Sequence, residues 1–464
     1  SINHLSFVKK SPTLKFVNCE SRRKVLMLGA GMVAKPMADY LLKNGFQLTI
    51  ASRTVSKAER LIGNDKNGTA VGWTTDNMNK LEELVSNHNL TVSLLPYKYH
   101  VDVAKICIKH QKCLVTTSYV SQEMKALDSQ AKKAGILILN EIGVDPGLDH
   151  MTAMHIIDRV HEDGGKIKKF YSLCGALPAP EEANNPFKYK FSWSPQGVLL
   201  AGNSGAIFMK DNEKVEITTE DLFKNPLAVE FPDIGNMEVY PTRDSLQYLD
   251  MYNLTETETM YRGTFRYPNW CEIMDAVKAL GMLSYDELNF ENKSYKEIVA
   301  EQIGVYPRNV KEKVAERLKL DLHSTAIEAM EWLGYFDKEL IQLNSGSTFD
   351  ITSYLMQNKM MLPLGARDMV ILQHSFLVIN SDKTQKVINA RLLEFGNKQN
   401  TAIARTVALP AAIAVKLILN KEIREEGVQI PVKKAIYEPV LNELNASGIK
   451  MEEQSKLPLS AMPE

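Results

Sequence analysis

A chain of 464 residues is too long to fold around one hydrophobic core, so two or three domains are expected. Apolar residues make up 44% of the sequence and charged residues 24%, and the formal net charge is −1. This balance argues against a nucleic-acid-binding surface and a polybasic membrane patch. The five cysteines form no CxxC pair, which indicates reduced thiols, and no apolar run is expected to cross a bilayer.

The first 23 residues are expected to be a leader or a linker. They carry five lysines and arginines against one acid, Glu20, and the chain begins at Ser1 without a methionine. A stretch that ends a linker of a longer polypeptide and a remnant of a targeting sequence both fit this composition. We therefore exclude residues 1–23 from the predicted domains.

From residue 24 onward, short apolar runs alternate with amphipathic helical patterns. This alternation predicts parallel strands with helices on both faces, and the right-handed crossover rule makes the sheet doubly wound and Rossmann-like. The predicted strands span residues 24–28, 47–51, 90–95, 113–117 and 136–140, with helices that include 101–108 and 121–134.

The pattern changes near Gly143, where an α+β domain with a mainly helical insertion is predicted. A hairpin is expected from two apolar runs that flank an Asn-Ser-Asp-Lys turn. The predicted elements are helix 149–160, strand 168–174, helices between 270 and 340, hairpin strands 368–379 and 385–395, and helix 401–419. The predicted domains are a dinucleotide-binding domain (24–144 and 400–450), a substrate-binding and dimerisation domain (145–230 and 350–399) and the insertion (231–349).

A glycine-rich turn joins the first predicted strand to the helix after it. The sequence Gly29-Ala30-Gly31-Met32-Val33-Ala34 fits the pattern G-x-G-x-x-A. The first glycine allows a tight turn, the second lets a pyrophosphate approach the backbone, and the small third residue lets helix and strand pack closely. Because the helix N-terminus favours anions, this turn predicts dinucleotide binding. The alternative is a packing turn that binds nothing.

The residue after the second strand distinguishes NAD from NADP. NAD sites usually carry an acid there for the ribose hydroxyls, whereas an arginine accommodates the 2′-phosphate. This chain has Ser52, Arg53 and Thr54 and no acid, which favours NADP over NAD. The alternative for Arg53 is a solvated loop arginine.

Further polar segments follow the predicted strands, at the edge where open α/β sheets bind ligands. Their sequences are Ser-Leu-Leu-Pro-Tyr at 93–97, Thr-Thr-Ser-Tyr at 116–119, Asp-Pro-Gly-Leu-Asp-His at 145–150 and Leu-Pro-Ala-Pro-Glu at 177–181. Together with Lys-Phe-Ser-Trp-Ser at 190–194 and Arg-Gly-Thr-Phe-Arg-Tyr at 262–267, they closely resemble the saccharopine dehydrogenase family of the glutamate-forming type. The resemblance covers residues 24 to about 445. It departs at Gly175-Ala176 and at Ala408-Leu409-Pro410.

The resemblance implies an NAD(P)-dependent oxidoreductase of lysine metabolism that acts on a CH–NH bond. Its substrates and products would be saccharopine, NAD(P)⁺ and water, and L-glutamate, 2-aminoadipate 6-semialdehyde and NAD(P)H. It further implies a homodimer in the mitochondrial matrix, or alternatively in the cytoplasm, with a possible upstream fusion to a lysine–ketoglutarate reductase domain. Neither a nucleic-acid partner nor a membrane is expected, and the physiological direction stays open.

The resemblance also assigns the candidate site residues. Substrate contacts are implied at Ser118, Tyr119, Asp145, Cys174, Arg243, Thr264, Phe265 and Arg266, while Arg262 is left doubtful. Cofactor contacts are implied at Gly29, Ala30, Gly31, Met32, Val33, Ser52, Arg53, Thr54, Ser93, Leu94, Leu95, Thr117, Val144 and Pro146.

The chemistry of the residues agrees with this assignment. Saccharopine carries three carboxylates and a secondary amine, so its site needs several cations and an acceptor for the amine. Residues 262, 264 and 266 would share a face of a strand, because side chains alternate with period two. Bidentate arginine–carboxylate pairs would then fix the orientation of the substrate.

Asp145 is the candidate catalytic residue, because a carboxylate there could hold the substrate ammonium and remove its proton. Alternatively, Asp145 caps the following helix or shapes the turn before Pro146. No Cys/His cluster or HExxH motif predicts a metal site, and His150 is interpreted as a structural hydrogen-bonding residue.

Two other functions remain possible at this stage. One is a related carboxyspermidine-type dehydrogenase that reduces another imine. The other is a dinucleotide-bound scaffold without enzymatic activity. The number of arginines and the Leu-Pro-Ala-Pro segment at 177–180 argue against the first. The Asp-Pro-Gly segment at 145–147 and the arginine segments argue against the second.

Overall fold

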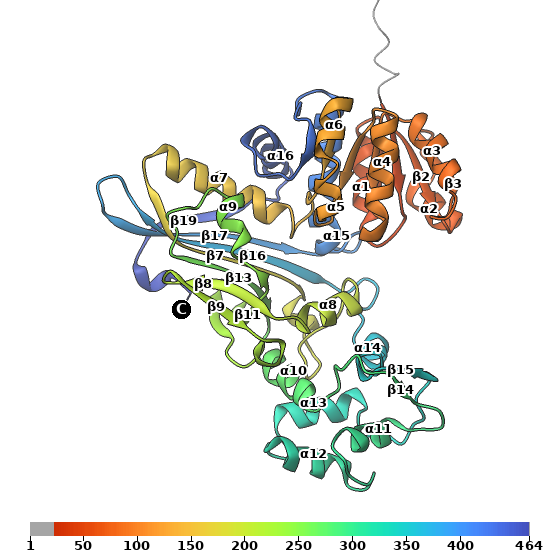
Figure 1. Cartoon of the computed structure of the whole chain (residues 1–464), viewed down its shortest axis with the longest axis vertical. Helices are drawn as coiled ribbons and strands as arrows, with labels where there is room; N and C mark the ends of the chain where they lie inside the picture. The colour runs from red at the N-terminus through yellow and green to blue at the C-terminus, as the bar shows by residue number, and fades with distance from the viewer. Residues whose placement is uncertain (1–22, 464) are drawn as a thin grey trace, which may run out of the picture.

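The computed structural model describes residues 23–463, so the leader or linker predicted at 1–23 lies almost wholly outside it. An all-parallel sheet with helices on both faces lies at one end of the molecule, a long mixed sheet crosses the middle, and a helical lobe occupies the other end (Figure 1). The predicted α/β class with a Rossmann-like sheet is confirmed.

The parallel sheet has seven strands within the described residues, and its central order is that of a doubly wound fold. Its amino-terminal strands are short and buried, because helices cover both faces. In spatial order the strands are β18 (Gly427–Gln429), β6 (Leu137–Leu139), β5 (Cys113–Thr116), β4 (Leu90–Ser93), β1 (Lys24–Leu28), β2 (Gln47–Ser52) and β3 (Gly68–Gly72).

Strand β3 was not predicted from sequence. Its sequence is Gly-Thr-Ala-Val-Gly, with a glycine at each end and only one bulky apolar residue, so its apolar pattern is weak. The helix predicted over 121–134 is interrupted at residues 126–127. The helices of this domain are α1 (Ala34–Lys43), α2 (Val55–Ile62), α3 (Met78–Ser86), α4 (His100–Lys109), α5 (Gln122–Lys125) and α6 (Asp128–Ala134).

Helix α15 (Ala402–Leu419) returns the chain to the parallel sheet and packs on α1 and on β16 of the mixed sheet. Among the described residues it is the one helix with the length and apolar composition of a membrane span, so the expectation that no apolar run is long enough is wrong on those criteria. However, 67% of this stretch is buried within the protein, as in a core helix. Helix α16 (Lys434–Ala446) packs beside it.

The mixed sheet has ten strands in the described part of the chain and contains the predicted hairpin. Strand β7 runs further than predicted, because β13 pairs with it on one side and β16 on the other. The main path is β10 (Leu227–Phe231), β11 (Gly235–Pro241), β13 (Thr259–Arg266), β7 (Lys166–Pro178), β16 (Asp368–Ile379), β17 (Gln385–Phe395) and β19 (Glu452–Leu457), with β8 (Ala206–Lys210), β9 (Glu213–Ile217) and β12 (Arg243–Asp244) attached at its side.

The helical insertion predicted over 231–349 is wrong at both ends. Its first part contributes β11 and β13 to the mixed sheet, and the last helix of the lobe continues past residue 349. Strand pairing overrides the local pattern here, because β13 is held between β11 and the distant strand β7. The lobe consists of α10 (Trp270–Ala279), α11 (Tyr295–Gln302), α12 (Val310–Leu318), α13 (Thr325–Leu333), α14 (Thr348–Lys359) and the small pair β14 (Leu288–Asn289) and β15 (Ser345–Gly346).

The hydrophobic cores show how the two sheets and the helical lobe are held together. Residues of α1, α15 and α7 share one core with the facing surfaces of both sheets. A second core joins the other face of the mixed sheet to the helical lobe. The two sheets are thus fixed through shared helices. The α-helices not yet described are α7 (Leu148–Glu162), α8 (Pro195–Gly202) and α9 (Gln247–Met251).

The first prediction concerns the contact between β16 and α15. The buried Asp368 carboxylate accepts hydrogen bonds from the backbone N–H groups of Ala402 (2.7 Å) and Ile403 (2.9 Å), which begin α15. Asp368→Ala removes this cap and is expected to lower the free energy of unfolding by about 1–2 kcal/mol. Urea denaturation measures the loss. Asp39→Ala, at an exposed ion pair, is the control, and equal effects of both variants would contradict the capping role.

Candidate active site

The turn after β1 has the shape that a dinucleotide requires. Gly29 has φ +106°, and a Cβ there would lie 3.3 Å from the carbonyl oxygen of Leu94, whereas a Cβ on Gly31 would meet nothing within 4 Å. Met32 is 61% exposed, and α1 begins only at Ala34. The turn is therefore closed against β4 and open on its outer side, where a pyrophosphate would face the N-terminus of α1.

The end of β2 carries positive charge. Arg53 and Thr54 are exposed, and the Thr54 N–H donates to Ser52 Oγ (3.3 Å). Close by, the pKa of the Tyr99 hydroxyl is lowered by hydrogen bonds with Thr75 and Lys98 and by the charges of Lys98 and Arg53. Arg53 and Lys98 thus both place positive charge near Tyr99.

The ends of β4 and β5 bring the next predicted residues together. Ser93 ends β4 and pairs with Thr116 at the end of β5, and Thr117 and Ser118 follow directly. Leu94 continues from β4 against the Gly29 turn, with its N–H donating to the Leu28 carbonyl oxygen. Predicted cofactor and substrate contacts thus lie on adjacent strand ends, at the carboxyl edge of the sheet. Leu95 follows Leu94 and packs, partly buried, on the core of the opposite face of the sheet.

A tight turn over residues 143–147 leads from the parallel sheet into α7. The Gly143 N–H donates to the Pro146 carbonyl oxygen (2.9 Å), and the Asp145–Pro146 peptide bond is cis. Gly147 has φ +147°, and a Cβ there would lie 2.2 Å from the backbone of Gly143, so only glycine fits. Within this turn Val144 and Pro146 are buried, whereas the Asp145 side chain is 28% exposed.

Arg262, which sequence analysis left doubtful, is the centre of this site. From the middle of β13, its Nη2 donates to Asp149 Oδ2 (2.7 Å) and to Asp145 Oδ1 (3.2 Å). Its guanidinium lies 4.1 Å from the ring centre of Tyr248, and Asp149 is fully buried. One cation therefore balances two carboxylates and joins the mixed sheet to the turn.

The two carboxylates differ in acidity. Burial and the charge of Asp149 raise the pKa of Asp145, although Arg262 opposes the shift. Burial also acts to raise the pKa of Asp149, but His150, Arg262 and the Gly147 N–H lower it to about 2. The two acids thus differ: the pKa of Asp149 favours its ionised form, whereas the pKa of Asp145 is shifted toward the protonated form.

His150 supports the same turn from behind and is a structural residue, as interpreted from the sequence. It is fully buried, with Nδ1 2.5 Å from the Tyr252 hydroxyl and Nε2 3.1 Å from Glu141 Oε2. Burial acts to lower the pKa of His150, but Asp149 and Glu141 raise it. Glu141 also accepts from the Val120 N–H (3.3 Å), which connects the two strand-end loops.

Tyr119 and Arg243 stand on the exposed side of Asp145. The Tyr119 hydroxyl donates to Asp145 Oδ1 (3.3 Å), and the Arg243 guanidinium lies 4.5 Å from the Tyr119 ring centre. Arg243 itself is exposed and has φ +57°. Burial and the charge of Asp145 raise the pKa of the Cys174 thiol well above its ordinary value, so the thiol stays protonated near this carboxylate.

Arg266 lies apart from Asp145, in a cage of aromatic rings. Its guanidinium is 4.8 Å from the Tyr189 ring centre, and Tyr240 and Trp270 complete the cage at 5.6 and 5.2 Å. Phe265 is fully buried behind it, and Thr264 is half-buried. Of the predicted arginines, the structure therefore brings Arg243 and Arg262 to Asp145 and gives Arg266 a separate position.

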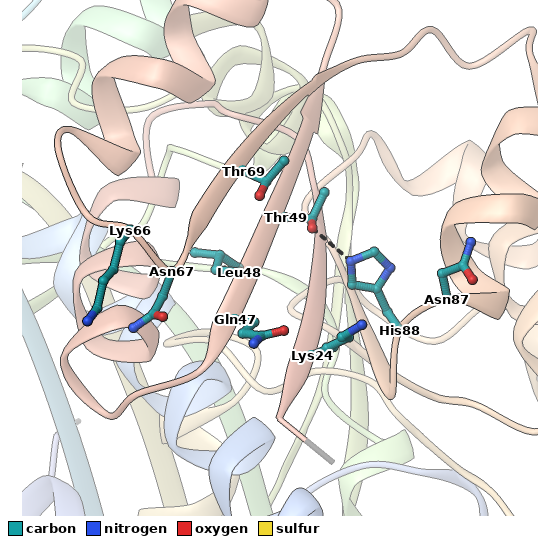
Figure 2. Close-up of a pocket in the computed structure, with 9 residues that line it drawn as sticks. All are labelled: Lys24, Gln47, Leu48, Thr49, Lys66, Asn67, Thr69, Asn87 and His88. Atoms are coloured by element: carbon teal, nitrogen blue, oxygen red, sulfur yellow. Dashed lines mark hydrogen bonds between the residues drawn. The ribbon is translucent and has the colours of Figure 1, made fainter. Parts of the chain in front are cut away.

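A separate pocket at the opposite end of the parallel sheet is not part of this site. It opens at the amino ends of β1, β2 and β3, and Lys24, Lys66 and Asn67 are among its lining residues (Figure 2). His88 closes one side, with Nε2 2.8 Å from Thr49 Oγ1. Because ligands of open α/β sheets bind at the carboxyl ends of the strands, this pocket does not belong to the dinucleotide site.

Sequence reasoning missed several residues of the site. Asp149, Tyr248 and Tyr252 surround Arg262, and Glu141 and His100 hold the loop at 117–120. The period of two along 262–266 was the one available signal, because it placed Arg262 beside two predicted contacts. The others depend on strand and helix pairings that local patterns do not contain.

A glycine turn at the carboxyl edge of a doubly wound sheet, with an exposed arginine after β2, is typical of a nicotinamide-dinucleotide-dependent oxidoreductase. Residues 25–139 match the saccharopine dehydrogenase NADP binding domain, and residues 143–449 match the saccharopine dehydrogenase C-terminal domain. The chain belongs to the saccharopine dehydrogenase family.

The similar proteins agree with this family. The NADP⁺, L-glutamate-forming saccharopine dehydrogenases of Schizosaccharomyces pombe and Pyricularia oryzae are 37% and 35% identical to 93% of this chain, over 98% and 99% of their own length. The mitochondrial alpha-aminoadipic semialdehyde synthase of Rattus norvegicus is 34% identical over 96% of this chain but only 49% of its own length. The apo saccharopine dehydrogenase (L-Glu forming) of Saccharomyces cerevisiae superposes with a TM-score of 0.87 at 33% identity, covering 93% of this chain and 99% of that one.

The second prediction tests the charge balance at Arg262. Arg262→Met leaves two buried or half-buried carboxylates without their cation and is expected to lower the free energy of unfolding by about 3–5 kcal/mol. Arg262→Lys keeps the charge but not the fork, so a smaller loss is expected. Chemical denaturation followed by tyrosine and tryptophan fluorescence compares both variants with the exposed control Arg60→Met. A loss of unfolding free energy in Arg262→Met no larger than that in the control would show that the two carboxylates do not depend on Arg262.

Proposed function

We propose that this chain is an NADP-dependent saccharopine dehydrogenase of the L-glutamate-forming type, an enzyme of lysine metabolism. In the oxidative direction, saccharopine, NADP⁺ and water give L-glutamate, 2-aminoadipate 6-semialdehyde, NADPH and a proton. When bound, NADP⁺ accepts the hydride from the carbon next to the secondary amine. The family, the fold and the fit of the glycine turn to a dinucleotide support this proposal.

The buried cation Arg266 is the observation that carries the choice of substrate. In residues 23–463 its guanidinium pairs with no carboxylate: Nη1 donates to the Phe265 carbonyl oxygen (2.8 Å), and Nε is buried without a partner. Glu238, its partner across the sheet, accepts instead from the N–H groups of Asn269 and Cys271. A buried unpaired cation is costly, so a ligand anion is expected to complete it. A carboxylate of saccharopine supplies that anion.

Arg243 supplies a second cation, and its charge acts on Asp145. It is exposed above Tyr119, and its guanidinium is free to form a bidentate pair with a second carboxylate. Two arginines in separate positions suit a substrate that carries several carboxylates. A polyamine-derived imine carries fewer carboxylates and would leave one of the arginines unpaired.

In this proposal the substrate amine lies next to Asp145. Its carboxylate holds the substrate ammonium and takes its proton, which frees the nitrogen lone pair that expels the hydride. The Tyr119 hydroxyl and Arg262 hold the carboxylate through the same Oδ1 atom, so Oδ2 is left for the amine. Proton transfer at Oδ2 thus proceeds without disturbing the contacts that orient the group. Thr264 and Ser118 would contact the substrate from β13 and from the β5 loop.

We also propose the location and the oligomeric state of the protein. Rat and mouse relatives with the name alpha-aminoadipic semialdehyde synthase are mitochondrial and about twice as long as the matched region, which supports a mitochondrial enzyme or the C-terminal part of a bifunctional one. Homodimerisation is proposed with it. Cell fractionation and sedimentation velocity test these two points.

The third prediction concerns the cofactor. Purified chain is expected to reduce NADP⁺ with saccharopine as the donor, and kcat/KM with NADP⁺ should exceed that with NAD⁺. Arg53→Glu removes the cation at the 2′-phosphate and should lower affinity for NADP⁺ by roughly tenfold to a hundredfold. Steady-state kinetics with both cofactors measures the switch. Arg60→Glu, on the exposed face of α2, is the charge-matched control, and an unchanged NADP⁺ preference in Arg53→Glu would reject this role.

The fourth prediction concerns Asp145. Because its pKa is raised, the acid limb of the kcat/KM profile for saccharopine should lie above the ordinary aspartate pKa of about 3.9. The rate falls as pH decreases through that limb, since the protonated acid cannot accept the amine proton. Asp145→Asn should lose about a hundredfold in rate and the limb itself.

The pH–rate profile decides between base and positioning roles. Tyr119→Phe serves as the comparison, because it removes a contact to Asp145 without removing the carboxylate. A profile of Asp145→Asn that keeps its acid limb, with a modest loss of rate, would assign proton removal to another group.

A further inference from the structure

His100 connects the two strand ends that carry the predicted cofactor and substrate contacts. It is the first residue of α4, and its ring points back to the carboxyl edge of the sheet. Nδ1 lies 3.0 Å from Ser93 Oγ at the end of β4, and Nε2 lies 2.9 Å from Ser118 Oγ beyond β5. Nε2 is also 3.2 Å from Thr116 Oγ1. One side chain therefore holds three hydroxyl groups from two neighbouring strands.

The ring is held in its neutral form. His100 is 4% exposed, and burial lowers its pKa to about 4. It stands at the N-terminus of α4, where the helix dipole also disfavours a positive charge. A neutral imidazole offers one N–H and one lone pair, so each nitrogen makes one defined kind of hydrogen bond. The direction of the Ser118 hydroxyl is then set by the ring.

The loop that carries Ser118 is also fixed at its backbone. The Ser118 N–H donates to Thr116 Oγ1 (3.3 Å), and its carbonyl oxygen accepts from the Glu141 N–H (3.1 Å). With the backbone held, the remaining freedom of Ser118 is the rotation of its side chain, which His100 restrains. Ser118 is half-buried and thus reachable by a ligand in the cleft.

We propose that His100 is a positioning residue, which fixes the hydroxyl of Ser118 against the nucleotide-binding strand and so aligns the substrate with the nicotinamide. This inference rests on the proposed function, because it takes Ser118 as a substrate contact. His100 itself touches neither ligand; it acts through Ser118, while its contact with Ser93 anchors the ring to β4.

Two amide replacements separate these contacts. A glutamine amide reaches the place of Nε2 and can restore the contact with Ser118, whereas an asparagine amide reaches the place of Nδ1 and can restore only the contact with Ser93. His100→Gln is expected to keep about tenfold more kcat/KM for saccharopine than His100→Asn or His100→Phe. Affinity for NADP⁺, measured by fluorescence titration, should change less than about threefold in all three variants.

A double-mutant cycle shows whether the effect passes through Ser118. In a Ser118→Ala background, His100→Asn should lower kcat/KM by less than about twofold, because the group it positions is already absent. His323→Asn, at an exposed histidine, is the matched control, and thermal unfolding of each variant identifies any general loss of folding.

These variants distinguish a positioning role of His100 from a packing role. Equal losses in His100→Gln and His100→Asn, or an undiminished effect of His100→Asn in Ser118→Ala, overturn the inference and leave a packing role for His100. The wild-type chain is the internal check on the proposed function. If it oxidises saccharopine while the His100 variants match it, only this inference fails, whereas no oxidation by the wild type rejects the proposed function.

Discussion

The ion-pair contact of Arg262 with Asp149 and Asp145 is the interaction on which the rest of the site depends. It joins the middle of β13 in the mixed sheet to the turn that leaves the parallel sheet, so it links the two sheets at the candidate site. Burial of a cation between two acids is favourable only with good geometry, and Tyr248 and the Gly147 N–H complete that geometry. Arg262 helps to lower the pKa of Asp149 and opposes the rise in the pKa of Asp145, so the two acids differ although they share one cation.

The charged side chains of the candidate site differ in their surroundings. Arg53 is exposed after β2, and Asp145 accepts hydrogen bonds from Arg262 and Tyr119. Arg266 lies in an aromatic cage and has no carboxylate partner among residues 23–463. His100 is kept neutral between strands β4 and β5.

Much of the fold follows from local patterns. The Gly29 turn, the alternation of strands and helices before Gly143 and the hairpin at 368–395 were predicted because each depends on residues close in sequence. Strand β3 was not, since its glycine-rich sequence forms a strand only beside β2. Strand β13 was assigned to a helical insertion for a similar reason, because it pairs with β7, a strand far from it in sequence. Strand β11 joins the same sheet through β13 and through β10, the strand before it in the chain. The candidate substrate contacts were assigned from family resemblance, but the contacts of these residues with one another could not be predicted from it.

The sequence by itself determined the class of fold, the dinucleotide turn and the family, because glycine spacing, apolar period and short motifs are local properties of the chain. The tertiary structure alone decided which charges meet. Arg262 and Asp149 are 113 residues apart, and nothing in either segment shows that the cation of one balances the acid of the other. The same holds for His100 and Ser118, whose hydrogen bond exists only because β4 and β5 are adjacent in the sheet. Pairing between distant segments sets distance and burial, and these set the acidity of the groups that do the chemistry.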